Sequence, residues 1–134
     1  MIRPIQEADK GRVKVLMRAL WPDQDVSSDL DDTIFVWEEP DGRLGGFISA
    51  AVRPWVEGAD AAPCPHIEGW YVEPDLRKRG IGRALVAAVE QWAREQGFQE
   101  LTSDVEMESA GSLAAHQALG FEPTEQIQYF RKKL

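Results

Sequence analysis

Cysteine is nearly absent from this 134-residue sequence. Cys64 stands alone, so an internal disulfide is excluded, and one thiol is too few for a structural zinc site. Long apolar runs are missing as well. None approaches the ~20 residues that a membrane-spanning helix needs, and the N-terminus lacks the apolar region of a signal peptide. The sequence therefore predicts no membrane insertion and a cytoplasmic location.

Net positive charge is missing too. The formal net charge of −8 argues against non-specific binding to nucleic acid or to an anionic membrane, because both require clustered Lys and Arg. Acidic residues gather between positions 23 and 41, whereas basic residues concentrate at 77–83 and 131–133. This distribution predicts a cationic partner on one side of the molecule and an anionic partner at the basic segment 77–83. A merely solvated acidic surface is the alternative.

Several well-known motifs are also lacking. The sequence has no Gly-Lys-Ser/Thr of a Walker loop, and its glycines do not fit the GxGxxG dinucleotide pattern. His66 and His116 with scattered carboxylates form no metal-ligand pattern, so no metal site is predicted. No serine has triad partners at a recognisable spacing, so the sequence does not predict a serine hydrolase.

Hydrophobic periodicity predicts one α/β domain over residues 1–134. Strands are predicted at 2–5, 33–38, 44–52, 66–72, 100–104 and 127–132, and helices at 9–20, 82–96 and 109–119. The order β-α-β-β-β-α-β-α-β predicts a mixed sheet with helices on its faces.

The most specific feature is a strand followed by a glycine-containing basic loop and a helix. The loop reads Arg77-Lys78-Arg79-Gly80-Ile81-Gly82-Arg83. Glycines allow close backbone approach, and free N–H groups of a first helical turn point at an anion. Cations at this helix end oppose the helix dipole, so an unliganded loop would be destabilised by them. The loop therefore predicts a phosphate-binding site.

Arg77-x-x-Gly80-x-Gly82 resembles the pyrophosphate loop of the GNAT acetyltransferases, and the predicted element order is similar to theirs along the whole chain. The resemblance implies acetyl-CoA as co-substrate and a mostly antiparallel sheet whose central strands splay around the pantetheine arm. It implies backbone contacts to that arm from Trp70, Tyr71 and Val72, and pyrophosphate binding by 77–83. Ser109 stands where the family more often has an Asn that contacts pantetheine.

A narrower resemblance concerns the amine substrate. Leu20-Trp21-Pro22, Ile67-Glu68-Gly69, Ser103-Asp104 and the segment from His116 to Glu122 are similar to the aminoglycoside 6′-N-acetyltransferases. By this resemblance the amine site is lined by Trp21, Trp55, Glu68, Asp104 and Glu125. Relatives are often homodimers, and apolar residues of the last predicted strand are available for such an interface.

The chemistry of amine acetylation alone also indicates a role for carboxylates. An amine arrives as a cation yet must be neutral to attack a thioester, so a carboxylate that binds the cation and accepts a proton serves both needs. Glu68 precedes the loop and Asp104 ends a predicted strand, where ligand sites of α/β sheets gather. The structural alternatives are a turn or N-cap role for Asp104 and a structural hydrogen bond for Glu68.

His116 stands where many family members carry the tyrosine that protonates the departing thiolate, in Ser112-x-x-x-His116-x-x-x-Gly120-Phe121. We predict that its imidazole bonds the cofactor sulfur or acts as the acid. A packed, structural histidine is an equal alternative.

These residues predict direct acetyl transfer from acetyl-CoA to a primary amine of a cationic small molecule, with the aminoglycoside 6′-amine as the first choice. A polyamine, a metabolite or a protein lysine is the rival substrate. A non-catalytic acetyl-CoA-binding or antibiotic-sequestering protein is the rival class.

Overall fold

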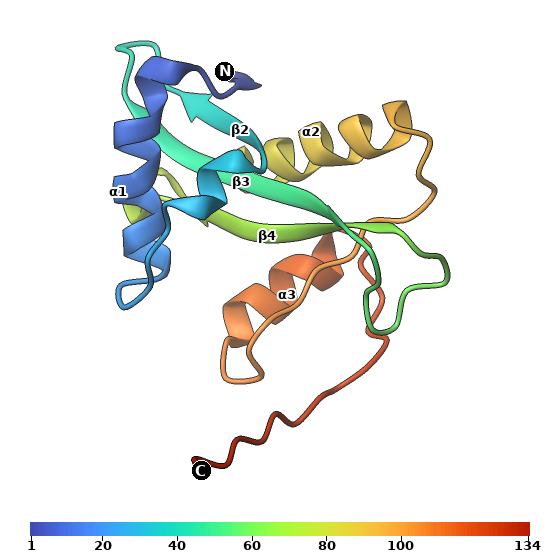
Figure 1. Cartoon of the computed structure of the whole chain (residues 1–134). Coiled ribbons are helices and arrows are strands. Elements are labelled where there is room, and N and C mark those ends of the chain that lie inside the picture. The colour runs from blue at the N-terminus through green and yellow to red at the C-terminus, as the bar shows by residue number, and fades with distance from the viewer.

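Four strands form one antiparallel sheet in the order β1-β2-β3-β4 (Figure 1). In this computed structural model β1 spans Ile2–Pro4, β2 Thr33–Glu38, β3 Leu44–Arg53 and β4 Cys64–Val72. The helices are α1 (Lys10–Leu20), α2 (Ile81–Glu95) and α3 (Ala110–Ala118), with 3₁₀ turns at Glu7–Asp9, Ser28–Asp31 and Pro74–Leu76. The structure describes the backbone of residues 1–134 and every side chain except those of Ser28 and Asp29. None of the helices it describes is long and apolar enough to cross a bilayer.

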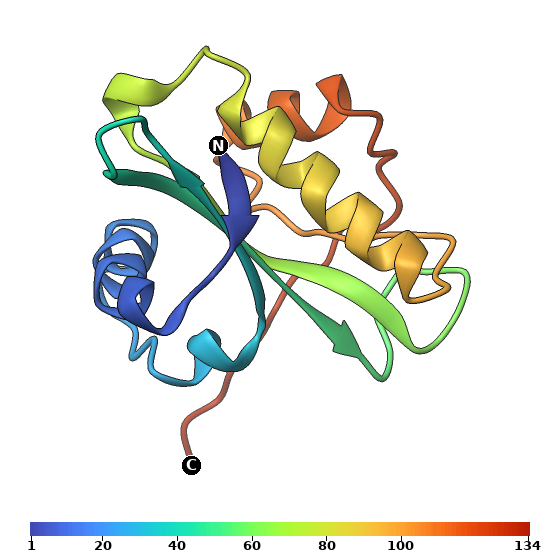
Figure 2. The same cartoon turned by 90° about the horizontal axis from the view of Figure 1, so that it is seen from above.

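Helix α1 covers one face of the sheet and α2 the other (Figure 2). Phe47 and Ile48 are neighbours on β3, so their side chains point to opposite faces, and both are fully buried. Each buried side chain of this size contributes about 1.5–3 kcal/mol. The α1 cluster around Phe47 includes Val13, Leu16, Met17, Ile34 and Val36; the α2 cluster around Ile48 includes Ile67, Ile81, Leu85, Val86 and Val89. The predicted helices on both faces are confirmed.

The strand predicted over 100–104 is wrong in extent. Only Thr102 pairs with β4, as a parallel bridge opposite His66. Ile67 N–H donates to Thr102 O at 2.9 Å, and Thr102 N–H donates to Pro65 O at 3.0 Å. Beyond Ile67 no described backbone group pairs with this side of β4, and at its end Val72 O accepts a side-chain hydrogen bond from Arg77 Nε at 2.8 Å.

The strand predicted over 127–132 is also wrong. After α3 the chain runs away from the body in both views (Figures 1 and 2), and Phe130 is 91% exposed. A strand forms only when a neighbour accepts and donates its backbone hydrogen bonds, and no described backbone group bonds to residues 127–132. Residues 127–132, the tail, have the alternating apolar pattern of a strand, but no neighbouring strand among the described residues is available to pair with them.

A β-bulge lies where β4 passes the middle of β3. Ser49 pairs with Gly69 and Ala50 pairs with Ile67, so one step along β3 corresponds to two steps along β4. Glu68 is the extra residue. A bulge re-aims the side chain it carries and increases the local twist, which places this carboxylate out of the ordinary alternation.

Candidate active site

The loop that follows β4 has the backbone of an anion site. Lys78 and Gly80 both have positive φ, 63° and 80°, and Gly80 is the N-cap residue of α2. The left-handed conformation at Gly80 suits glycine, which has no Cβ to clash. The first bond of the helix runs from Ala84 N–H to Gly80 O at 3.0 Å, so the N–H groups of residues 81–83 precede it and are free for a ligand. These groups fit a pyrophosphate.

The four cations of the loop are not equivalent. Arg77 donates from Nε to Val72 O at 2.8 Å and lies over the Tyr71 ring, 5.6 Å from its centroid. Arg79 donates to Glu39 at 2.8 and 3.4 Å. Among the side chains that the structure describes, Lys78 and Arg83 have no carboxylate partner. Arg77 has no carboxylate partner among them either, but its guanidinium is held by Val72 O and the Tyr71 ring. Lys78 and Arg83 are therefore the cations left for an anion.

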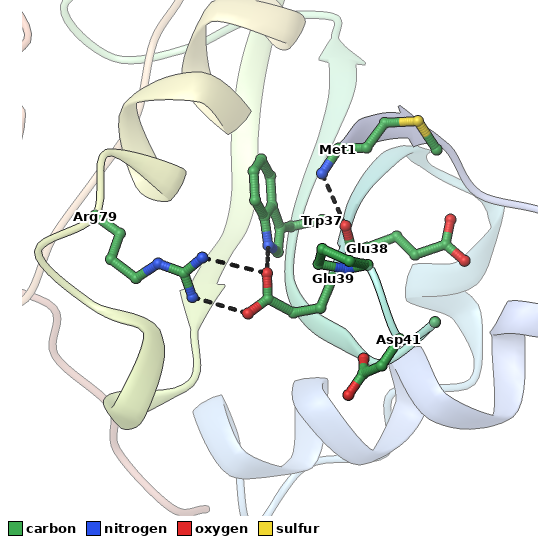
Figure 3. A pocket seen from close by; sticks show the side chains of 8 residues that line it. Met1, Trp37, Glu38, Glu39, Asp41 and Arg79 are labelled. Carbon is green, nitrogen blue, oxygen red and sulfur yellow. Dashed lines mark hydrogen bonds and ion pairs between the residues drawn. The ribbon is translucent and has the colours of Figure 1, made fainter.

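Figure 3 shows the surroundings of the Arg79–Glu39 pair. Glu39 also accepts Trp37 Nε1–H at 2.9 Å, and Arg79, followed by Trp37, holds the pKa of Glu39 below its ordinary value. The hollow at this place is lined by Met1, Trp37, Glu38, Glu39, Pro40, Asp41, Gly42 and Arg79. None of these is a predicted amine-site residue. The Arg79–Glu39 ion pair therefore joins the loop 77–83 to the β2–β3 hairpin, away from the residues predicted to bind the amine.

The free edge of β4 lies directly before this loop. Trp70, Tyr71 and Val72 keep their β3 partners on one side, so only their other side is open. The Trp70 side chain is directed toward α2, because a Cβ on Gly82 would lie 3.2 Å from Trp70 Cζ2. Ser109 precedes α3 and makes no side-chain cap, while its carbonyl accepts Leu113 N–H at 3.0 Å. The open edge leaves backbone N–H and C=O groups that can pair with an extended ligand, as they would with another strand.

Glu68 is not a free carboxylate. Arg53 of β3 donates to it from Nε at 2.7 Å and from a terminal nitrogen at 2.6 Å, and Glu68 raises the pKa of Arg53. Such a two-point contact is among the stronger ion pairs, although Arg53 is partly exposed. An incoming ammonium therefore meets an Arg–Glu pair here.

Asp104 lies near this pair and is held by a buried histidine. His66 Nε2 is 3.3 Å from Asp104 Oδ2, and His66 Nδ1 is 2.8 Å from Thr102 Oγ1. The hydrogen bond from His66 holds the pKa of Asp104 below its ordinary value, so the carboxylate is ionised at neutral pH. Sequence reasoning missed Arg53, His66 and Thr102. The equal two-residue spacing of His66 to Glu68 and of Thr102 to Asp104 was the available signal.

His116 is bonded through both ring nitrogens. Its Nδ1 lies 2.7 Å from Ser112 O, a pure acceptor, so Nδ1 carries the hydrogen. Its Nε2 lies 2.8 Å from Ser103 Oγ and accepts that hydroxyl. The ring also meets Trp70 and Phe121 edge to face. These contacts favour a role in fixing Ser103, the neighbour of Asp104, over the predicted acid role.

The other predicted amine-site residues are spread around this centre. Trp21 lies over Gly69, where a Cβ would come 2.5 Å from Trp21 Cη2, so glycine is required for this close approach. Glu125 lies against Gly58 in the loop between β3 and β4. Trp55, in the same loop, is 65% exposed. The structure thus brings Trp21, Glu68 and Asp104 toward one region and leaves Trp55 in solvent. Within the described residues no group of three or more His, Cys, Asp and Glu is arranged to hold a metal ion.

Comparison with known proteins gives consistent matches over the whole chain. The acetyltransferase (GNAT) family matches residues 5–121. An aminoglycoside N(6′)-acetyltransferase type 1 of Stenotrophomonas maltophilia is 39% identical, covering 99% of this chain and 93% of that protein. A protein of the same name from Klebsiella aerogenes is 33% identical, covering 100% and 97%.

Solved structures agree. AAC(6′)-Iy in complex with a CoA–acetylneamine bisubstrate analogue superposes with a TM-score of 0.89 at 33% identity, covering 100% of this chain and 98% of that one. The aminoglycoside 6′-N-acetyltransferase AAC(6′)-Ih of Acinetobacter baumannii gives 0.89 at 30% identity, with the same coverage.

Proposed function

Since the chain belongs to the GNAT acetyltransferase family, we propose that it uses acetyl-CoA to acetylate the 6′-amine of aminoglycosides. The observation that carries the substrate assignment is the acidic centre at Glu68 and Asp104, which lies beside the free edge of β4. A polycationic substrate fits a chain with a net charge of −8. Residues 1–134 act as one acetyltransferase domain in this proposal.

Residues 77–83 hold the pyrophosphate of acetyl-CoA, by the free N–H groups of α2 and by Lys78 and Arg83. Backbone groups of Trp70, Tyr71 and Val72 and the hydroxyl of Ser109 contact the pantetheine arm. Bound in this way, acetyl-CoA supplies the acetyl thioester. The backbone N–H near Val72 polarises the thioester carbonyl, as in an oxyanion hole.

Asp104 binds the substrate ammonium and takes one of its protons, directly or through water. The neutral amine then forms the new N–C bond as the C–S bond breaks, and the electron pair of that bond leaves with sulfur. The second proton of the nitrogen passes to this sulfur through water, which gives the neutral amide and the free thiol of CoA, while Asp104 returns its proton to solvent. Glu68 and Glu125 bind other ammonium groups of the substrate, while Trp21 and Trp55 stack on sugar rings. His116 holds Ser103, and through it the segment that carries Asp104.

Product analysis tests this proposal. Kanamycin is incubated with enzyme and acetyl-CoA, and the acetylated nitrogen is located by NMR. A single product acetylated at the 6′-nitrogen supports the proposal. Acetylation at another position, or none with any aminoglycoside while spermidine or a lysine peptide is acetylated, contradicts the substrate assignment.

Glu68→Gln raises KM for aminoglycosides by about tenfold, which corresponds to about 1.4 kcal/mol of binding free energy. The reason is twofold, since the variant removes a negative charge and leaves the guanidinium of Arg53 unpaired beside the site. Steady-state kinetics at fixed acetyl-CoA measures the effect. The double variant Arg53→Gln/Glu68→Gln is the control, and we expect it to recover part of the lost affinity. A KM for Glu68→Gln equal to that of the wild type would mean that the pair does not face the substrate.

We also propose that the enzyme is a cytoplasmic homodimer in which the tail is covered by a second copy. Tyr129 and Phe130 are exposed in the single chain, and Arg131, Lys132 and Lys133 next to them are opposite in charge to the acidic body. A second copy would supply the strand partner that the tail lacks.

Deleting residues 127–134 converts the dimer to a monomer. Light scattering of the full chain is expected to give twice the chain mass of 15.1 kDa, and the deletion variant to give a single chain mass. Because residues 127–134 make no backbone hydrogen bonds to the rest of the chain, we expect the deletion variant to melt at the same temperature as the full-length chain in its monomeric state. A full-length chain that scatters as a monomer at micromolar concentration contradicts the dimer.

A further inference from the structure

The side chain that contacts Asp104 is almost fully buried, while Asp104 itself is open to solvent. His66 is 2% exposed, and the Asp104 side chain is 78% exposed. His66 reaches it from β4, and its other ring nitrogen faces Thr102. The three residues form a chain of contacts from the sheet to the surface.

The hydrogens of this chain can be placed by counting donors. In one arrangement the Thr102 hydroxyl donates to His66 Nδ1, and Pro65 O accepts Thr102 N–H alone, at 3.0 Å. Nε2 then carries the hydrogen and donates to Asp104. If the hydroxyl donates instead to Pro65 O, at 2.9 Å, His66 must donate from Nδ1 to Thr102 Oγ1. A neutral ring in that arrangement has no hydrogen on Nε2, so two acceptors, Nε2 and the Asp104 carboxylate, would face each other at 3.3 Å. The carboxylate therefore favours the first arrangement, in which Nε2–H points at Asp104.

This contact contributes little to folding. A carboxylate that is largely exposed is well solvated by water, and ion pairs at such positions contribute little to stability. Burying an imidazole carries a cost unless its nitrogens are bonded. The arrangement therefore uses a buried, rotationally fixed donor to restrict a side chain that would otherwise sample several rotamers.

We propose that His66 is a positioning residue, whose Nε2–H, oriented by Thr102, fixes the Asp104 carboxylate in the orientation that accepts the proton of the substrate amine. This inference rests on the proposed function, because it names how the base of that reaction is held. The placement of a base affects the rate as well as its presence, since misplacement by about 1 Å can cost about 10²-fold in rate.

The first test does not use activity. His66 and His116 are the two histidines of the chain, and their contacts require opposite tautomers. Ring ¹⁵N shifts from long-range ¹H–¹⁵N correlation spectra are expected to show hydrogen on Nε2 of His66 and, for neutral His116, on Nδ1 only. Asp104→Asn should shift the His66 Nε2 signal and leave that of His116 nearly unchanged. A His66 with a bare Nε2, or one indifferent to Asp104→Asn, overturns the proposal.

The second test compares two amides that each replace half of the imidazole. The amide nitrogen of His66→Gln can occupy the position of Nε2, whereas that of His66→Asn reaches only the position of Nδ1. We expect kcat/KM for kanamycin to fall about threefold in His66→Gln and about 30-fold in His66→Asn, at equal melting temperatures, because misplacement of the base lowers the rate. In an Asp104→Asn background the two variants should be equal. Equal losses in the wild-type background would overturn the positioning role.

The two tests separate the possible failures. If no aminoglycoside is turned over but the Nε2–H signal of His66 responds to Asp104→Asn, the proposed substrate is wrong and the contact stands. The Gln/Asn comparison is then repeated with the amine that is turned over. If aminoglycosides are acetylated and both His66 variants are equally active, the positioning role is wrong and the proposed function stands.

Discussion

Asp104→Asn is expected to lower kcat/KM for aminoglycosides by about 10²–10³-fold, within the range for loss of a general base. The variant keeps the shape of the side chain and can still contact His66, but an amide cannot take a proton from an ammonium group. The proposed loss is therefore in chemistry and in binding of the cation. The value of kcat/KM for kanamycin is determined from initial rates of thiol release, with acetyl-CoA saturating and kanamycin varied.

Two features make this result specific. The deficit should shrink as the pH approaches the pKa of the substrate amine, because a growing fraction of the amine is then already neutral and needs no base. Glu106→Gln is the matched control, since it removes one exposed carboxylate two residues further on and should change kcat/KM less than twofold. An Asp104→Asn enzyme with wild-type activity at neutral pH would show that the proton goes elsewhere.

Arg83→Glu is expected to weaken acetyl-CoA binding by about 100-fold, about 2.7 kcal/mol, which is the size of a lost charge-assisted hydrogen bond. Arg83 is the third residue of α2 and has no carboxylate partner among the described side chains. A glutamate there places a negative charge at the positive end of the helix dipole, which stabilises the helix by about 0.3–1 kcal/mol. The protein should therefore melt at the same temperature or slightly higher while it loses its cofactor.

A graded series separates charge from folding. Arg83→Gln is expected to lie between wild type and Arg83→Glu in dissociation constant, as measured by calorimetric titration with CoA. The differences in the dissociation constant for CoA among the wild type, Arg83→Gln and Arg83→Glu should become smaller at high salt, because salt screens the charges of an exposed site. Equal CoA affinities across the series would mean that the pyrophosphate is not held at this helix end.

The cofactor loop could be predicted from sequence because its signal is local. Glycine at a left-handed position, a helix start and adjacent cations lie within seven residues, from Arg77 to Arg83, and the structure forms the expected loop and helix. The positions of α1, α2 and α3 were predictable for the same reason, since apolar residues at helical spacing mark each one. The roles of the loop residues in binding stay predictions.

The acidic centre was predictable only in part. The choice of Glu68 and Asp104 as site residues stays a prediction, and the bulge that re-aims Glu68 leaves no mark on the hydrophobic pattern. The contact between His66 and Asp104 joins residues 38 positions apart and depends on a parallel register at Thr102. A pattern within one strand cannot report such a register. For the same reason Arg53 was missed as the partner of Glu68.

The tail shows the opposite error. Residues 127–132 carry a strand-like pattern, yet they form no strand because strand formation needs a partner that the single chain does not provide. Local propensity was read correctly and the pairing was not. The dimer proposed above would restore the predicted strand at an interface between two chains.

The central claim is that this acetyltransferase selects aminoglycosides as acceptors. It is tested most directly by kcat/KM for kanamycin and tobramycin, spermidine and a lysine peptide, measured side by side by thiol release from acetyl-CoA. The account predicts that both aminoglycosides exceed the other amines by at least about 100-fold, roughly 2.7 kcal/mol of transition-state stabilisation. Comparable or higher values for spermidine or the peptide would contradict it and leave only the fold and the cofactor in place.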